Sequence, residues 1–286
     1  MTNQVATLKF NAVIEGIDKV GYFVKRLIGV SEFYAKSTLI LTISEDSFVL
    51  CKGVDSVLSS TITELWLNNK QCFDQYEFME TERGQVSFEI ESDQLNDVLR
   101  GIEVYKQRVD MLKLRVAQVD SNLYLRIKIP NLNATHDINT ELKPLADLTE
   151  YRMPVNNKDY TSAIIPESGK LERILTGFKN MDHPTVEFLL WVSKKQLRIS
   201  GSDTDCSSTI IMKDLDVTQK INGEDDADIL DKMKVRISLQ NLHTVLKGFL
   251  DSREPVEVRV TNQNSARFVV QKTDGIFTLH LSHIHD

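Results

Sequence analysis

Residues 95–101 read L-N-D-V-L-R-G, and residues 242–248, 147 positions later, read L-H-T-V-L-K-G. Each stretch places a cation and then a glycine after the same apolar spacing, and each lies between strand-like runs. Two more pairs are alike in the same order, at separations of 149 and 144 positions: 42–53 with 191–202, and 112–116 with 256–260. Self-similarity of such a long period predicts a duplicated domain rather than a solenoid. The alternative is chance similarity between amphipathic helices.

Composition and charge limit the class of protein. The chain has 286 residues, enough for two domains of ordinary size, and 41% of them are hydrophobic. A formal net charge of −7 argues against broad attraction to nucleic acid, although one locally basic surface remains compatible with it. No apolar run reaches the roughly 18 residues of a membrane span, and the N-terminus does not resemble a secretory signal. Cys51, Cys72 and Cys206 lack metal-type spacing, which indicates buried thiols in a reducing compartment.

Hydrophobic periodicity predicts helix, strands, helix, strands in each half. Helices are expected over 16–36, from Ser92, from Ser168 and around residues 242–249, with Ser92 and Ser168 as N-caps. Strands are expected at 39–43, 48–51, 61–67, 86–90, 111–116, 123–129, 186–192, 197–200, 209–212, 235–239, 256–260, 267–270 and 277–281. A proline-bounded stretch without sustained periodicity separates the halves. We therefore predict domains at 1–140 and 156–286, joined by an interdomain connector at 141–155.

Outward-facing cations recur on all four expected helices and just beyond their ends. If the helices face one way, they form a positive surface on an acidic chain, which suits phosphate contact without base reading. Arg100 and Lys247 occupy matching repeat positions, and the glycine after each destabilises a helix unless something approaches closely. The alternative is that surface helices simply carry Lys and Arg. The candidate phosphate-contacting residues are Lys19, Lys25, Arg26, Arg100, Lys106, Arg108, Lys170, Arg173, Lys179, Lys247 and Arg253.

Candidate enzyme sites are weak. Asp203 and Asp205 follow a strand and are more typical of an Asp-rich turn than of a metal site. The C-terminal tail, with His283, His285 and Asp286, has no third ligand in a fixed position and so is a weak metal site. The adjacent pair His136 and Asp137 has no nucleophile motif beside it. The sequence contains no phosphate-binding glycine loop, no G-x-S-x-G and no C-x-x-C. We expect no cofactor and no enzymatic activity; a metal-dependent hydrolase is a distant alternative.

The sequence resembles the sliding DNA clamps, most closely the Hus subunit of the nine-one-one checkpoint clamp, a relative of proliferating cell nuclear antigen. Residues 8–16, L-K-F-N-A-V-I-E-G, are similar to the opening strand of that family, and residues 38–51, T-L-I-L-T-I-S-E-D-S-F-V-L-C, to its first hairpin. Residues 135–138, T-H-D-I, match the segment before the connector and favour the Hus type. The resemblance covers nearly the whole chain.

This resemblance implies an α+β sliding-clamp fold of two similar domains, each with two helices on one face of antiparallel sheets. The helices would line a central hole, and three subunits would close a ring through edge strands. The implied protein is a nuclear, non-enzymatic subunit of a heterotrimeric ring in DNA damage checkpoint signalling. Its partners would be two other clamp-like subunits, double-stranded DNA, a clamp loader, and checkpoint and repair proteins that dock near Leu145, Leu148 and Tyr151. A homotrimeric replication clamp is the alternative.

Overall fold

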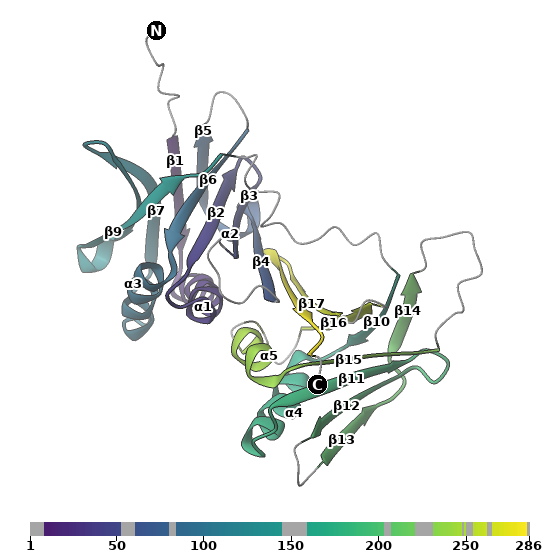
Figure 1. The fold of residues 1–286 in the computed structure, drawn as a ribbon. Helices are drawn as coiled ribbons and strands as arrows, with labels where there is room; N and C mark the ends of the chain where they lie inside the picture. Colours follow the sequence, from purple (N-terminus) through teal and green to yellow (C-terminus); the bar gives the residue numbers. More distant parts are fainter. Residues whose placement is uncertain are drawn as a thin grey trace. The chain divides into compact units, whose positions relative to one another are not determined.

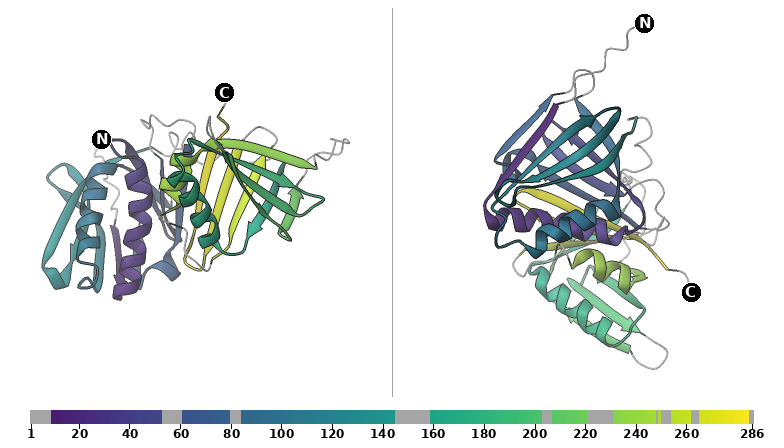
Figure 2. Two further views of the ribbon diagram at one scale, coloured as in Figure 1. Left: turned by 90° about the horizontal axis from the view of Figure 1, so that it is seen from below. Right: turned by 90° about the vertical axis from the view of Figure 1, so that its left-hand side faces the viewer.

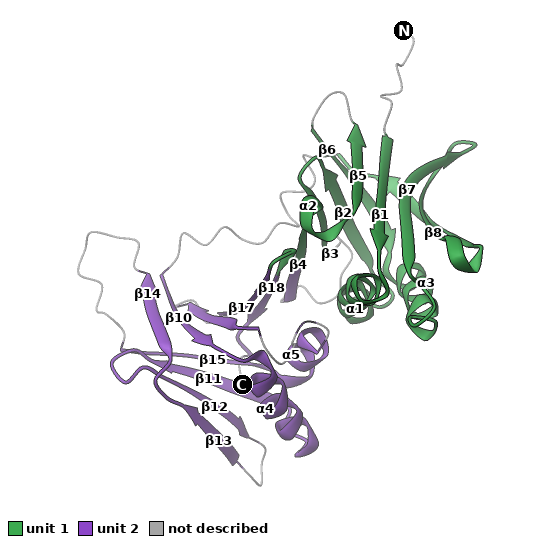
Figure 3. Ribbon diagram, turned by 180° about the vertical axis from the view of Figure 1, so that it is seen from behind, with its two compact units in different colours: residues 1–57, 64–152, 273–276 green, residues 58–63, 153–272, 277–286 purple. Residues whose placement is uncertain are grey.

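The structure, a computed structural model, describes residues 9–52, 61–79, 84–144, 159–202, 207–220, 231–247, 249, 254–261 and 265–284. The chain forms two compact units (Figure 3). Unit 1 comprises residues 1–57, 64–152 and 273–276, and unit 2 comprises residues 58–63, 153–272 and 277–286. The domain boundaries expected from the sequence remain a prediction, because most of the expected connector lies outside the described residues.

The elements alternate as the periodicity predicts (Figure 1). The first half contains β1 (Lys9–Glu15), α1 (Ile17–Phe33), β2 (Thr38–Ser44), β3 (Ser47–Lys52), β4 (Thr61–Asn68), α2 (Asn69–Cys72), β5 (Gln75–Met79), β6 (Gln85–Glu91), α3 (Ser92–Val104), β7 (Met111–Val119), β8 (Asn122–Ile129), the 3₁₀ turn η1 (Pro130–Leu132) and β9 (Ala134–Leu142). The second contains β10 (Tyr160–Ile165), α4 (Ser168–Asn180), β11 (Thr185–Trp191), β12 (Gln196–Ser202), β13 (Ser207–Met212), β14 (Asp216–Lys220), β15 (Lys232–Ser238), α5 (Leu239–Leu246), β16 (Val256–Thr261), β17 (Ser265–Lys272) and β18 (Gly275–Ser282).

The two halves repeat one order of elements, which confirms the predicted duplication. Each half begins with a strand and a long helix, continues with strands, and ends with another long helix or helical segment followed by three strands; the short α2 interrupts the strands of the first half only. The similar sequence pairs lie on equivalent elements: α3 with α5, β2 and β3 with β11 and β12, and β7 with β16. The expected opening strand is also present as β1.

Both units are built on antiparallel pairing. In unit 1, β1 pairs with β5 and β7, β7 to β9 form a meander, and β2 pairs with β3 and β6. In unit 2, the strand order of one sheet is β13-β12-β11-β15, and β10 pairs with β14 and β16. The helices α1 and α3 lie side by side on one face of unit 1, and α4 and α5 do so in unit 2 (Figure 2).

An apolar stripe on each helix packs onto the strands below it. Burial of each Leu or Phe side chain stabilises the fold by about 1.5–3 kcal/mol. Most apolar helix residues that the periodicity directs inward are buried, but Ile17 at the start of α1 is 45% exposed, and Val98 on α3 and Ile174 on α4 are half-buried. The buried helix residues include Val20, Val24 and Leu27 of α1, Leu95, Leu99 and Ile102 of α3, Leu171, Leu175 and Phe178 of α4, and Leu242, Val245 and Leu246 of α5.

The helix ends differ from expectation. The first helix ends at Phe33 and not at residue 36. Ser92 is the first residue of α3 rather than its N-cap, and its buried hydroxyl donates to the carbonyl oxygen of Tyr34, 2.6 Å away. Ser168 likewise lies within α4, after Glu167. The side chain that caps a helix in unit 2 is Ser238, whose Oγ accepts from the Asn241 amide at 3.2 Å.

Candidate nucleic-acid interface

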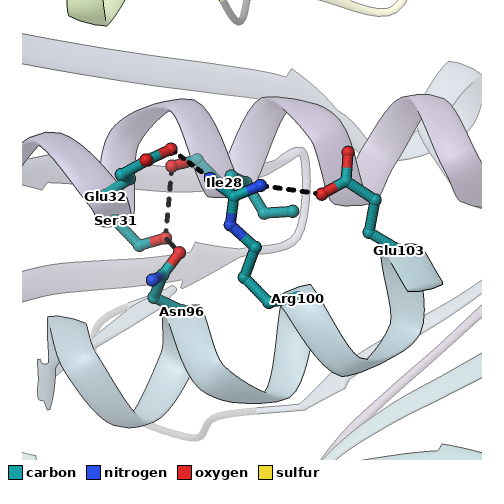
Figure 4. A network of polar contacts seen from close by, with 6 residues as sticks. All are labelled: Ile28, Ser31, Glu32, Asn96, Arg100 and Glu103. Carbon is teal, nitrogen blue, oxygen red and sulfur yellow. Dashed lines mark hydrogen bonds and ion pairs between the residues drawn. The ribbon is translucent and has the colours of Figure 1, made fainter.

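Arg100 is exposed on α3, but its guanidinium is held by two carboxylates (Figure 4). One nitrogen donates to Glu32 of α1 at 2.5 Å and the other to Glu103 at 2.9 Å. Beside it, Ser31 of α1 and Asn96 of α3 are 3.4 Å apart at their side-chain oxygens. Such exposed ion pairs stabilise a protein by only about 0–1 kcal/mol. They nevertheless place negative charge on both sides of Arg100.

Arg26 does not face outward, so this part of the prediction is wrong. The residue is 3% exposed, and its guanidinium donates to both carboxylate oxygens of Asp274, at 2.7 and 2.8 Å, within unit 1. Its guanidinium also lies 3.9 Å from the centre of the Tyr22 ring. Burial alone would lower the pKa of Arg26, but the Asp274 carboxylate raises it above the ordinary value. Nothing within the helical pattern reveals this partner, which lies 248 positions away in the sequence.

Other predicted cations of unit 1 also lie close to acids. Lys19 is half-buried and forms a 2.8 Å ion pair with Asp74. Burial raises the pKa of Asp74, but its bonds with Lys19 and the Glu15 amide lower it overall. Lys25 and Lys106 are exposed and line a hollow of about 220 Å³ between α1 and α3, together with the carboxylates of Asp18 and Glu103. Arg108 is exposed beyond the end of α3.

The predicted cations of unit 2 are arranged differently. Arg173, Lys179 and Lys247 are exposed, and none of them forms an ion pair with a described residue. Lys170 is 3.5 Å from Glu167. We call the surface formed by Arg173, Lys179, Lys247, Thr176 and His243 the α4–α5 face.

His243 joins the two helices of unit 2 and was not singled out by the sequence. It is 8% exposed, and its Nε2 lies 3.2 Å from the hydroxyl of Thr176 on α4. Burial lowers the pKa of His243, and the positive charges of Lys179 and Lys247 lower it further.

Several predicted site residues lie outside the described part of the chain: Arg253, Leu145, Leu148, Tyr151, Asp203, Asp205, His285 and Asp286. Two of the described candidates for an enzyme site have structural partners instead. Asp137 on β9 binds Arg126 on the neighbouring strand, which lowers the pKa of Asp137. The Nδ1 of His283 accepts from the Arg236 amide at 3.0 Å. Within the described ranges, no group of three His, Cys, Asp or Glu side chains could hold a metal ion.

The comparisons with solved structures identify the fold. The chain is similar to PCNA from Thermococcus kodakaraensis, with a TM-score of 0.68, 13% identity, and coverage of 96% of this chain and 100% of that one. Proliferating cellular nuclear antigen from Entamoeba histolytica is similar at a TM-score of 0.68 and 12% identity, covering 96% and 99%. A. fulgidus PCNA, solved with the C-terminal region of FEN-1, is similar with a TM-score of 0.68 and 12% identity, and the match covers 97% of this chain and 99% of that one.

The chain therefore has the sliding-clamp fold, an α+β architecture of two similar domains, as the sequence predicted. No protein-family model matches the sequence, and no curated relative is found by sequence comparison. None of the described helices combines the length and the apolar character needed to cross a membrane.

Proposed function

We propose that the chain is a non-enzymatic subunit of a ring-shaped clamp that encircles double-stranded DNA in the nucleus. The observation that carries this proposal is the duplicated architecture, together with its likeness to PCNA over 96–97% of the chain. A ring holds DNA topologically, so weak and mobile phosphate contacts suffice. This agrees with a chain of net charge −7 that carries local clusters of Lys and Arg.

In the proposed ring, edge strands of neighbouring subunits pair with one another. β13 is the outermost strand of its sheet among the described residues, and it exposes Ile210 and Ile211. In unit 1, one side of β9 pairs with β8 along residues 134–140. The other side pairs with β6 along residues 140–142 only, so residues 134–139 have no second neighbour among the described strands. Both edges offer free backbone groups for strand addition by another chain.

We assign the chain to a heterotrimeric ring of the nine-one-one type, which signals DNA damage and recruits repair enzymes. Residues 135–138 support this choice because they resemble the Hus subunit. A homotrimeric replication clamp is the second candidate, supported by the similarity to PCNA. Recruitment is supported by the A. fulgidus structure, which contains the C-terminal region of FEN-1. We propose that such partners dock near Leu145, Leu148 and Tyr151, and that a loader opens the ring.

Purification of the tagged chain from cells, with its stoichiometric partners, tests the assignment. We expect two other clamp-like subunits, and a complex that is retained on closed circular DNA and released when the DNA is linearised. A stable homotrimer in light scattering would instead establish the replication clamp. Absence of any topological retention would reject both. Metal-dependent hydrolysis that Asp203→Ala abolishes would restore the enzyme alternative.

A further inference from the structure

The cations predicted to face DNA are not equivalent in the two units. We propose that the α4–α5 face of unit 2 is the surface of this chain that binds the phosphodiester backbone of duplex DNA, and that the helices of unit 1 contribute little. This inference rests on the proposed clamp function, and it assigns the phosphate contacts to one of the two repeats. Such asymmetry does not follow from the duplication, which predicts equal roles for α3 and α5.

The exposed side of α3 is acidic and apolar. Asp93, Asp97, Gly101 and Val104 are exposed at spacings of four, four and three residues, which places them on one face of the helix. Val104 is 77% exposed. Since Arg100 is held between Glu32 and Glu103, a phosphate that approached it would meet two carboxylates within a few ångströms.

The positive charges of α1 are likewise balanced by nearby carboxylates. Lys19 pairs with Asp74, and Arg26 is buried against Asp274. Lys25 is exposed, but it lines the same hollow as Asp18 and Glu103. The ranges of α1 and α3 together contain five carboxylates and four cations, so this surface has no excess of positive charge to attract a polyanion.

The exposed side of α4 has the opposite character. Gly169, Arg173 and Gly177 follow one another at spacings of four residues and share one face, with the cation between two positions that lack a side chain. A Cβ atom built at Gly177 would meet nothing within 4 Å, so a DNA backbone could come close to the helix there. Glu172 is the one carboxylate within α4, and α5 contains none.

The seam between α4 and α5 adds polar groups to these cations. The Thr176 hydroxyl lies beside the His243 imidazole, and both Lys179 and Lys247 act electrostatically on that ring. One lysine on α4 and one directly after α5 thus lie near His243, whose neighbour Thr176 carries a hydroxyl group that can donate to a phosphate oxygen. Together with Arg173, they supply three cations that no described carboxylate neutralises through an ion pair.

Two triple charge reversals with equal changes in net charge test the proposal. One variant combines Arg173→Glu, Lys179→Glu and Lys247→Glu, and its control combines Lys25→Glu, Lys106→Glu and Arg108→Glu in unit 1. All six side chains are exposed and free of ion pairs with described residues, so folding should survive, as circular dichroism and thermal unfolding would check. Glutamine versions of both sets replace any reversal that fails to fold.

The measurement is the affinity of each full-length variant for a labelled linear duplex, by fluorescence anisotropy over a range of salt concentrations. We expect the unit 2 variant to bind roughly a hundredfold more weakly at low salt, and its salt exponent to fall by about 0.9 for each lost phosphate contact. The control should keep the salt exponent of the wild-type chain.

Equal losses in the two variants, or a larger loss in the unit 1 variant, would overturn the inference but leave the clamp function intact. Loss of a protein partner from the unit 2 variant, with unchanged DNA affinity, would assign the face to an acidic protein segment and also overturn it. If the wild-type complex is not retained on closed circular DNA, the proposed function itself fails. Retention on the circle together with a selective loss in the unit 2 variant supports both.

Discussion

At the scale of single residues, His243 should make the stability of the protein depend on pH. Its pKa in the folded state is lowered below the ordinary 6.5 by burial, then by Lys179 and Lys247, while Glu172 opposes the shift. As the pH falls below about 6.5, the unfolded chain takes up a proton at this position before the folded chain does. Acidification therefore favours unfolding until the lowered pKa is passed, and above about pH 6.5 the residue contributes no pH dependence.

Replacement His243→Gln should remove this contribution while keeping an acceptor near Thr176. Urea unfolding of both proteins from pH 7.5 down to pH 5 measures it. We expect the wild type to lose more stability than the variant over this interval, with the two curves parallel above pH 7. Identical curves over the whole interval would show that the folded and unfolded states titrate alike at this position.

Single polar residues are also where the sequence was least informative. The helical spacing of α1 places Arg26 next to the apolar stripe, so its side chain could lie on either side of that boundary. Its burial depends on Asp274, which comes from a turn more than 240 positions later. Removing one partner of a buried pair of this kind costs about 3–5 kcal/mol. The Ser92 hydroxyl likewise binds a carbonyl oxygen from the end of α1, a contact that local capping rules cannot reveal.

At the scale of elements, two glycines with opposite surroundings should respond oppositely to alanine. Gly101 lies in α3 with nothing within 4 Å of an added Cβ, so Gly101→Ala should stabilise the protein by about 1 kcal/mol through helix propensity. Gly201 lies on β12, where an added Cβ would be 2.5 Å from the Cδ2 of the His183 ring and 3.1 Å from the Phe178 ring. Gly201→Ala should destabilise it by about 1–3 kcal/mol, as overpacking does.

Chemical denaturation of the two variants beside the wild type measures this pair. Each substitution adds one methyl group, so any difference between the two changes in the free energy of unfolding comes from the surroundings of the two glycines. Destabilisation by Gly101→Ala would indicate that the exposed side of α3 is covered in the molecule as it exists in solution.

Elements with a strong apolar period could be predicted, and elements without one could not. The main helices and the half-buried strands show their periods in sequence. In contrast, β9 buries only Ile138 and Thr140 among nine mostly polar residues, and β5 and β14 have no fully buried side chain. Backbone pairing with neighbouring strands holds such segments in the sheet, and side-chain patterns do not record it. β10 could not be predicted for a different reason: it is buried on both faces, so its apolar and polar residues do not alternate.

At the scale of the whole molecule, the fold could be predicted because the chain contains two copies of the same unit, whose sequence similarities reveal the duplication. The assembly could not be predicted in the same way, because each interface of the proposed ring would depend on a neighbouring subunit as well as on this chain. The structure does indicate where to look, since an outermost strand with exposed apolar residues is a surface that soluble proteins usually cover or protect with charge.

Charge on the β13 edge should therefore prevent ring formation without unfolding the subunit. Ile210 and Ile211 are 38% and 51% exposed, so the double variant Ile210→Lys, Ile211→Lys should lose little folding stability in the isolated chain. An interface formed by this edge would have to bury two unpaired ammonium groups, which is strongly unfavourable. Light scattering of the complex reconstituted with its partner subunits measures the outcome, and we expect the ring to be lost. Val119→Lys, at a side chain 43% exposed on β7, is the control and should leave assembly intact. Rings that form equally well with both variants would exclude the β13 edge from the subunit interface.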